Sequence, residues 1–313
     1  MTQSRHDTDA ATPPAAIWLL LGSGLAFACL DTSAKYLVTS GMSPQFVSWM
    51  RFVEHAILAL ILLRSWTNIA TFRVNNLPLQ LLRGMFLVGA TVFNFFALRT
   101  LQLADAMSIM FFGPMMITAL AGPMLGEWAG WRRWLAIAVA FIGVLVIARP
   151  GFVTIDIGHI YVFCSMISGS LYAIMTRYLA PTETPESLIF YSALAPAILL
   201  APFGLATASM PAEPLHWVVL SCLGLFGGVG HWWVIQAYRR ASATALAPYP
   251  YAQMVWMIIS GYLVFNQLPD LWTLVGAAII VASGLYIVHR EHRLRLANRT
   301  LPTVEDATLS EKL

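Results

Sequence analysis

The chain has 313 residues, of which 58% are hydrophobic and 11% are charged, and its net charge is +3. Soluble domains carry about 25% charged residues, so most of this surface is predicted to face lipid rather than water. The small net charge and the lack of a basic run exclude a nucleic-acid partner. Cys29, Cys164 and Cys222 have unrelated spacings, so we expect no metal motif, no disulfide framework and no cofactor.

The N-terminal segment, residues 1–16, is polar and is predicted to be disordered and cytoplasmic. Prolines, rather than basic residues, precede the first apolar run at Ile17, and no clean cleavage site follows that run. The segment therefore does not have the pattern of a conventional secretory signal peptide.

Apolar segments, each about one bilayer thick, then follow in succession with short loops between them. A helix needs about 20 apolar residues to cross the hydrocarbon core of a bilayer. The sequence therefore predicts an all-α membrane protein of ten transmembrane helices embedded in the lipid bilayer. The predicted spans are 17–39, 44–64, 77–98, 102–124, 132–148, 157–178, 187–207, 215–236, 242–264 and 270–288.

The loops predict the orientation of the chain. If the N-terminus is cytoplasmic, most of the arginines lie on the cytoplasmic side, and only Lys35, Arg99 and Arg149 lie near the opposite side. Lys and Arg are enriched in cytoplasmic loops, so both termini are predicted to be cytoplasmic. An even number of spans agrees with this, because it returns the chain to the side on which it started.

A weak internal similarity indicates a repeat. Residues 89–127 align with residues 229–267 without a gap, and Ala97-Leu98-Arg99 then falls on Ala237-Tyr238-Arg239. The identities are few, but the pattern of spans repeats with them. Chance similarity among apolar helices is the alternative interpretation.

The repeat divides the chain into two halves of five spans. Residues 17–148 form the first half, residues 157–288 form the second, and residues 289–313 form a cytoplasmic tail. Five is odd, so the second half enters the membrane from the opposite side. Inverted repeats of this kind are typical of secondary transporters, which bind their substrate near the midplane between the halves.

Four ionisable residues lie inside the first two spans: Asp31, Lys35, Arg51 and Glu54. A charge near the bilayer centre costs about 2.5–3.5 kcal/mol on insertion scales, so such residues are interpreted as functional. Asp31 or Glu54 would bind a cationic group or a coupling proton, and Lys35 or Arg51 a carboxylate or phosphate. Asn94 lies at a similar depth. The alternative is structural, with two self-neutralising pairs of these charges that pin the first two helices together. Asp31 and Lys35 share one helix face, and Arg51 and Glu54 share another.

Other side chains are predicted to complete a binding pocket. His231 and Trp232 lie in the eighth span, and Tyr249 and Trp256 in the ninth. An aromatic-lined cavity with an acid suits a flat ring or an organic cation, through stacking and cation–π attraction. Plain packing, or an interfacial position for Tyr249, is the alternative.

Prolines interrupt the fourth and ninth spans, which are equivalent in the two halves. They are Pro114 and Pro123 in the fourth, and Pro248 and Pro250 in the ninth. Proline removes a backbone hydrogen bond and kinks a helix, so both spans are predicted to bend. The bends would act either as hinges or as static features of the packing.

The chain resembles the drug/metabolite transporter superfamily, of the ten-span EamA type. The resemblance rests on Pro114, on Leu125-Gly126-Glu127 at a cytoplasmic turn, and on Gly143 in the following span. The second half has Asn266-Gln267 where the family pattern has Gly-Glu, which suggests that Glu127 serves the fold more than transport.

A narrower resemblance is to a bacterial subgroup that holds proposed riboflavin and S-adenosylmethionine carriers. It rests on Asp31 and Lys35, on Arg51, on Leu82-Arg83, and on the run from Leu103 to Ala106. The resemblance implies a multi-pass protein of the bacterial inner membrane. Fold analogy alone does not define the ligand.

We therefore expect a secondary active transporter that moves a small polar or amphipathic metabolite by alternating access, as a monomer or a homodimer. The substrate would be a flat-ring, cationic or zwitterionic molecule, with a proton or a sodium ion as the coupling ion. Export of amino acids or drug-like organic cations is the main alternative, and a non-transporting scaffold or a channel is a remote one. No enzymatic motif such as His-Glu-x-x-His is present, so an enzyme is not expected.

Overall fold

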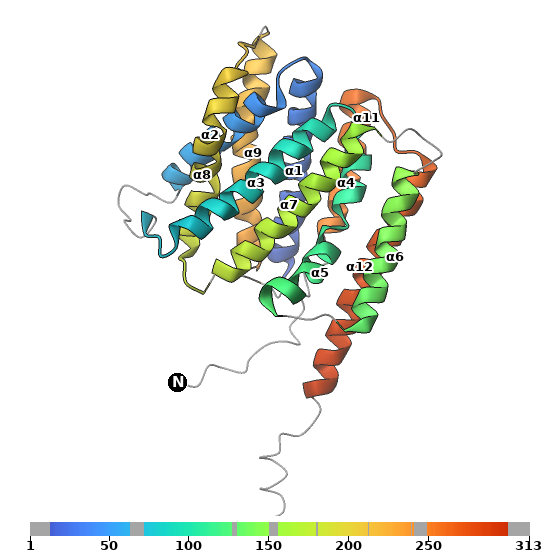
Figure 1. Ribbon diagram of the computed structural model, residues 1–313. Coiled ribbons are helices and arrows are strands. Elements are labelled where there is room, and N and C mark those ends of the chain that lie inside the picture. The colour runs from blue at the N-terminus through green and yellow to red at the C-terminus, as the bar shows by residue number, and fades with distance from the viewer. Residues whose placement is uncertain are drawn as a thin grey trace, which may run out of the picture.

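The computed structural model describes residues 13–62, 72–126, 130–149, 156–179, 181–211, 213–238, 240 and 249–299. Throughout these ranges the secondary structure is helical and contains no strand (Figure 1). The α-helices are α1 (Pro14–Thr39), α2 (Pro44–Leu62), α3 (Leu77–Leu98), α4 (Leu103–Met110), α5 (Gly113–Leu125), α6 (Trp131–Ala148), α7 (Ile157–Leu179), α8 (Pro185–Ala206), α9 (Pro214–Tyr238), α11 (Gln253–Phe265) and α12 (Leu271–Arg299). A 3₁₀ turn, η2 (Tyr249–Ala252), leads directly into α11.

The helices coincide with the predicted apolar segments. Seven of them, counting α4 and α5 as one, are long and apolar enough to cross a membrane. Shorter apolar helices occupy 134–148, 253–265 and 271–287. Two predicted boundaries are wrong: α1 already begins at Pro14, and α12 continues into the polar tail as far as Arg299.

The fourth predicted span is broken rather than continuous. It ends as α4 at Met110 and resumes as α5 at Gly113. Pro114 occupies the first turn of α5, where its missing N–H costs no hydrogen bond, and Pro123 lies inside that helix. In the ninth span η2 precedes α11, while Pro248 lies outside the described residues.

The exterior of the bundle is apolar. Large hydrophobic side chains such as Ile57, Leu135, Ile198 and Leu263 are exposed on α2, α6, α8 and α11. Monomeric soluble proteins rarely expose apolar surface on this scale. The chain is therefore a multi-pass membrane protein whose outer face meets lipid.

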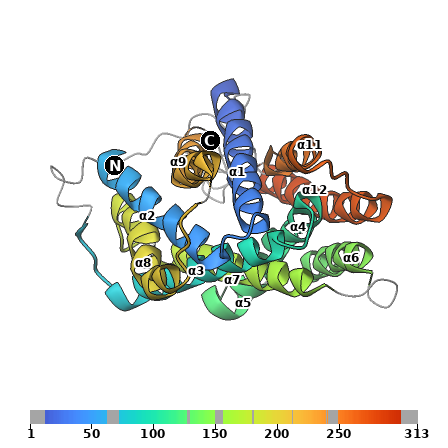
Figure 2. The same ribbon diagram turned by 90° about the horizontal axis from the view of Figure 1, so that it is seen from above.

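The helices pack in pairs along the molecule. α3 packs on α7, α1 on α9, α2 on α8, and α6 on α12. The α2–α8 pair lies at one side and the α6–α12 pair at the other, with α1, α3, α7 and α9 between them (Figure 2). Elements of the two halves of the chain thus alternate through the whole bundle.

Turns gather at two opposite ends of the bundle. We call the end with the α1–α2 turn, residues 40–43, the distal end. The end with the α7–α8 turn, residues 181–184, is the proximal end, which the positive charges predict to be cytoplasmic. At the proximal end the buried carboxylate of Glu183 accepts hydrogen bonds from the backbone N–H groups of Asn75 and Asn76, at 3.0 and 2.9 Å, and so holds the start of α3.

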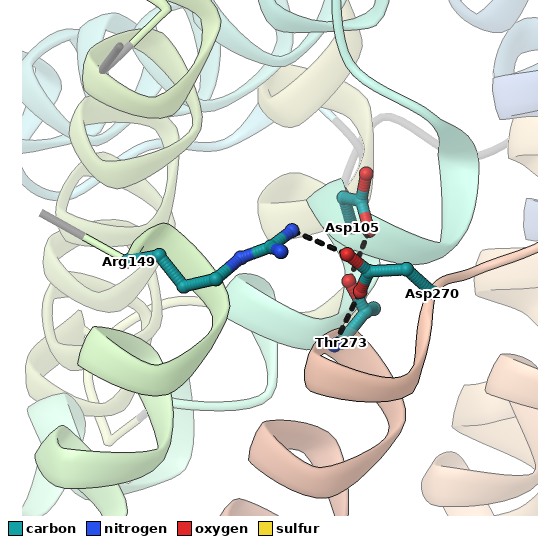
Figure 3. Close-up of polar contacts among 4 residues, drawn as sticks. All are labelled: Asp105, Arg149, Asp270 and Thr273. Carbon is teal, nitrogen blue, oxygen red and sulfur yellow. Dashed lines mark hydrogen bonds and ion pairs between the residues drawn. The ribbon is translucent and has the colours of Figure 1, made fainter. Parts of the chain in front are cut away.

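A polar cluster joins α4, α6 and α12 at the distal end (Figure 3). Arg149, which ends α6 in a left-handed conformation with φ of 42°, forms an ion pair with Asp270. Asp270 also accepts a hydrogen bond from the backbone N–H of Thr273, at 2.8 Å. The Thr273 hydroxyl donates to Asp105 at 2.6 Å. The cluster fastens the distal ends of these three helices together.

Candidate functional site

A cavity of about 350 Å³ lies in the middle of the bundle. Its wall comes from both halves of the chain, with residues of α1, α2, α3 and α4 facing residues of α7, α9 and α11. The polar side chains in its wall are Asp31, Arg51, Thr91, Asn94, Tyr172, His231 and Gln253. The larger apolar ones are Phe27, Phe95, Met107, Met110 and Met257.

Asp31 of α1 supplies the negative charge of the cavity. Its carboxylate accepts a hydrogen bond from the Asn94 side-chain amide of α3 at 3.0 Å. The sequence predicted both residues as site residues, and the fold brings them together from separate helices. The amide orients the carboxylate but leaves acceptor capacity for a further donor.

Arg51 of α2 supplies the positive charge. Its side chain is 6% exposed, and Nη1 donates to the Thr91 hydroxyl at 2.5 Å. The guanidinium also lies 4.9 Å from the centre of the Phe52 ring. Its Nε–H is buried and has no hydrogen-bond partner among the described residues. A buried unpaired donor is costly, and this one lies against α9, where a Cβ at Gly227 would be 3.5 Å from it.

The four intramembrane charges do not form the self-neutralising pairs of the structural alternative. Neither Asp31–Lys35 nor Arg51–Glu54 forms an ion pair, and within the described ranges the ion pair is Arg149–Asp270. Each of the four side chains instead finds partners on another element. The physical reason is that a helix packed on several neighbours offers its polar groups closer partners than its own next turn.

Lys35 lies at the distal end, away from the cavity wall. It is 3% exposed, and its ammonium donates to the Leu101 carbonyl at 2.6 Å and to the Gln267 side-chain oxygen at 2.9 Å. It also lies 5.0 Å from the centre of the Phe265 ring. Lys35 thus ties α1 to the turns that follow α3 and α11.

Glu54 also lies outside the cavity. Its carboxylate accepts a hydrogen bond from the backbone N–H of Gly224, in the middle of α9, at 2.7 Å. A Cβ at Gly224 would lie within 2.8 Å of the Glu54 backbone, so only glycine allows α2 and α9 to approach this closely. The contact makes Glu54 part of the seam between the two helices.

Of the predicted residues in the second half, His231 lines the cavity. Its ring stands at the edge of Phe27, with 5.1 Å between centres, and is stacked on His55 at 5.7 Å. Trp232 is 41% exposed and borders a separate small pocket. Tyr249 packs against a small cluster of Ala16, Leu20 and Ala237.

Trp256 is half-buried against the main core and does not line the cavity. Its indole N–H is buried without a hydrogen-bond partner in the part of the chain that the structure describes. Glu127, which the sequence assigned to the fold, lies outside the described residues.

Three polar residues of the cavity were not singled out from the sequence. Thr91 lies one turn before Asn94 on α3, Gln253 begins α11, and Tyr172 lies in the middle of α7. The Tyr172 hydroxyl is 3.0 Å from that of Ser192 and lies near the buried Arg83. A polar residue spaced i,i+3 from Asn94 was the available signal for Thr91.

These features define a class of protein: a helical, multi-pass membrane protein with a charged cavity between the two halves of its chain. The model of the EamA-like transporter family matches residues 14–149 and again residues 156–289. The chain therefore belongs to the EamA-like transporter family, within the drug/metabolite transporter superfamily.

Transporters from other organisms are similar to this chain over most of its length. It is 28% identical over 284 residues to an S-adenosylmethionine uptake transporter of Rickettsia conorii, covering 88% of this chain and 92% of that protein. It is 25% identical over 295 residues to a riboflavin transporter of Vibrio cholerae, covering 91% and 96%. A crystal structure matches with a TM-score of 0.59 at 17% identity, covering 86% and 97%, and shows the shared fold.

Proposed function

We propose that this protein is a secondary active transporter that moves a small zwitterionic metabolite across the bacterial inner membrane. Residues 17–148 and 157–288 would form two inverted repeats of five spans, with both termini cytoplasmic. Alternating access would come from rocking one half against the other around the cavity. The two successive family matches and the shared cavity wall support this arrangement.

The observation that carries the substrate proposal is the separation of charge in the cavity. Asp31 and Arg51 share its wall without forming an ion pair, and the Nε–H of Arg51 has no partner among the described residues. A ligand with an ammonium and a carboxylate group would satisfy both. Arginine binds carboxylates with two parallel hydrogen bonds, which suits it to this role.

The rest of the wall suits a larger, partly apolar group. Phe27 and Phe95 offer ring faces, and three methionines offer adaptable, polarizable surface. A volume of about 350 Å³ lies within the range of small-molecule sites. S-adenosylmethionine combines an amino-acid zwitterion with a flat adenine ring, and a relative carries its name. Riboflavin, which also names a relative, has the flat ring but no amino-acid group.

The test is uptake of labelled S-adenosylmethionine and riboflavin into proteoliposomes. We expect saturable uptake of S-adenosylmethionine, and at least a tenfold loss in Asp31→Asn and Arg51→Met. Arg132→Met makes the same change at an exposed position on α6 and should keep full uptake.

Three results would contradict the proposal. If riboflavin alone were taken up, the inferred substrate would be a flat neutral ring compound and not a zwitterion. Full uptake in both cavity variants would remove the two charges from substrate binding. No uptake of either compound by folded wild-type protein would refute this substrate class, and a screen of amino acids and organic cations in the export direction would follow.

A further inference from the structure

Two stacked histidines lie between the central cavity and a second, smaller pocket. His231 of α9 and His55 of α2 have ring centres 5.7 Å apart and ring planes inclined by 7°. His55 is 6% exposed. His55 does not line the cavity, so substrate binding by Asp31 and Arg51 does not explain its position behind His231. The histidine pair therefore has room for another role.

The smaller pocket, which we call the side pocket, has a volume of about 30 Å³. Its lining residues are His55, Leu58, Ala59, Leu62, Ile189, Gly228, His231 and Trp232. Leu62 ends α2 and Ile189 lies near the start of α8, so the side pocket lies toward the proximal end. A space of this size holds about one or two waters.

His231 is the residue that the linings of the cavity and the side pocket share. The His231 ring therefore borders the substrate space on one side and the side pocket on the other, and His55 also lines that side pocket. Imidazole can accept a proton at one ring nitrogen and release one from the other. A pair of imidazoles between two spaces is thus suited to passing protons from one space to the other.

We propose that the coupling ion is a proton, and that His231 and His55 relay it between the central cavity and the proximal side of the membrane. This inference rests on the proposed transport function. His231 accepts a proton from the cavity at one ring nitrogen and releases the proton of its other nitrogen to a water in the side pocket, which passes a proton on to His55. His55 then releases a proton to water at the proximal side, and both rings return to the neutral form.

The charges around the pair suit a relay rather than a storage site. Arg51 shares the cavity wall with His231, so a fixed positive charge lies near the pair. Asp31 and the Tyr172 hydroxyl share the cavity with His231, so the Asp31 carboxylate can take up a proton from the cavity and then donate it to His231. Glu54 is next to His55 on α2, but its carboxylate accepts the hydrogen bond from the Gly224 N–H. From α8, the side pocket is lined only by the apolar Ile189.

Glycines of α9 bring the two rings together. A Cβ at Gly228 would meet the side chain of Leu58 and would lie 3.7 Å from the His55 ring. A Cβ at Gly227 would lie 3.5 Å from the Arg51 Nε. Small residues at these positions let α2 approach α9 closely enough for the histidines to stack.

The test separates driven uptake from exchange in the same proteoliposomes. Uptake of labelled S-adenosylmethionine is measured under an imposed pH gradient, with a pH-sensitive dye inside the vesicles. Exchange of labelled for unlabelled compound is measured without a gradient. We expect the driven uptake and its dye signal to fall at least tenfold in both His231→Gln and His55→Gln. Exchange should stay within about twofold of wild type in His55→Gln, because His55 does not line the cavity.

His216→Gln is the matched control. His216 also lies on α9 and is 9% exposed, but its ring is tilted against that of Tyr36, with 5.5 Å between centres, at the distal end. We expect this variant to keep both driven uptake and exchange.

The contrary results are distinct. Driven uptake that survives in both His231→Gln and His55→Gln would overturn the relay, while the proposed transport function would stand. Loss of exchange together with driven uptake in folded His231→Gln would make His231 a substrate ligand instead. Wild-type uptake without proton movement would overturn the relay even if the variants fail to fold. Absence of all exchange by the wild type would overturn the proposed function, and the relay with it.

Discussion

At the scale of single residues, the position of a charge along a span says less about its role than the element it contacts. Asp31 and Arg51 face the same cavity, whereas Lys35, one turn beyond Asp31, is directed to the distal turns. Glu54, one turn beyond Arg51, meets a backbone amide of α9. Four similar-looking intramembrane charges therefore divide into two that line the site and two that hold helices together.

Glu54 gives a test of this division. In Glu54→Gln the side-chain oxygen can still accept the hydrogen bond from Gly224, so we expect thermal stability in detergent and uptake to change little. In Glu54→Leu that acceptor is lost, and we expect destabilisation of about 1–3 kcal/mol. Thermal unfolding of the purified variants measures the difference. Loss of uptake in Glu54→Gln at unchanged stability would place the carboxyl group in the transport chemistry instead.

At the scale of elements, glycines decide which helices approach closely. α6 and α12 meet at Gly143 and Gly276, and a Cβ at Gly143 would lie 2.8 Å from the Gly276 carbonyl oxygen. Without a hydrophobic driving force between helices in lipid, such close packing contributes much of their association. The same rule holds for α2 and α9 at Gly224.

A pair of glycine substitutions tests this packing. Gly143→Ala must push α6 away from α12, because the new methyl group meets backbone as well as the Ile280 side chain at 2.7 Å. We expect a loss of about 1–3 kcal/mol of stability. Gly169→Ala is the matched control on α7, since its Cβ would lie 3.8 Å from Ala90. Equal melting temperatures for the two variants would show that α6 and α12 tolerate separation.

At the scale of the whole molecule, polar contacts close the bundle at both ends of the cavity. Glu183 holds the start of α3 at the proximal end, and Lys35 holds α1 to Leu101 and Gln267 at the distal end. The Arg149–Asp270 pair adds a tie between α6 and α12 there (Figure 3). In the proposed alternating-access cycle these contacts would break in turn, and their strength would set the balance between the two open forms.

Removing the distal tie should shift that balance. In Lys35→Met the Leu101 carbonyl and Gln267 lose their shared donor, so we expect more of the form that opens distally. The measurement is labelling of Asn94→Cys by a membrane-impermeant thiol reagent added from the distal side, in protein without its native cysteines. We expect labelling to become several-fold faster in Lys35→Met. An unchanged rate would show that Lys35 does not limit distal opening.

The sequence by itself determined the helical class, the position of each apolar segment and the polar residues buried within them. These properties are local, because span length and hydropathy follow directly from the thickness of the bilayer. The prolines predicted a bend in the fourth span, and the structure places the break after Met110. The extension of α12 to Arg299 was not predicted.

Only the tertiary structure decided which polar residues share one cavity. The lipid-facing and packed faces of a membrane helix are both apolar: in α8, Ala197 is 9% exposed and the adjacent Ile198 is 62% exposed. Hydropathy therefore does not reveal how each helix is rotated. That rotation brings Asp31, Arg51, Asn94 and His231 to a common wall and turns Lys35, Glu54, Trp232, Tyr249 and Trp256 to other contacts. It also joins Thr91, Tyr172 and Gln253 to the site, because packing between distant segments, and not spacing along the chain, sets their neighbours.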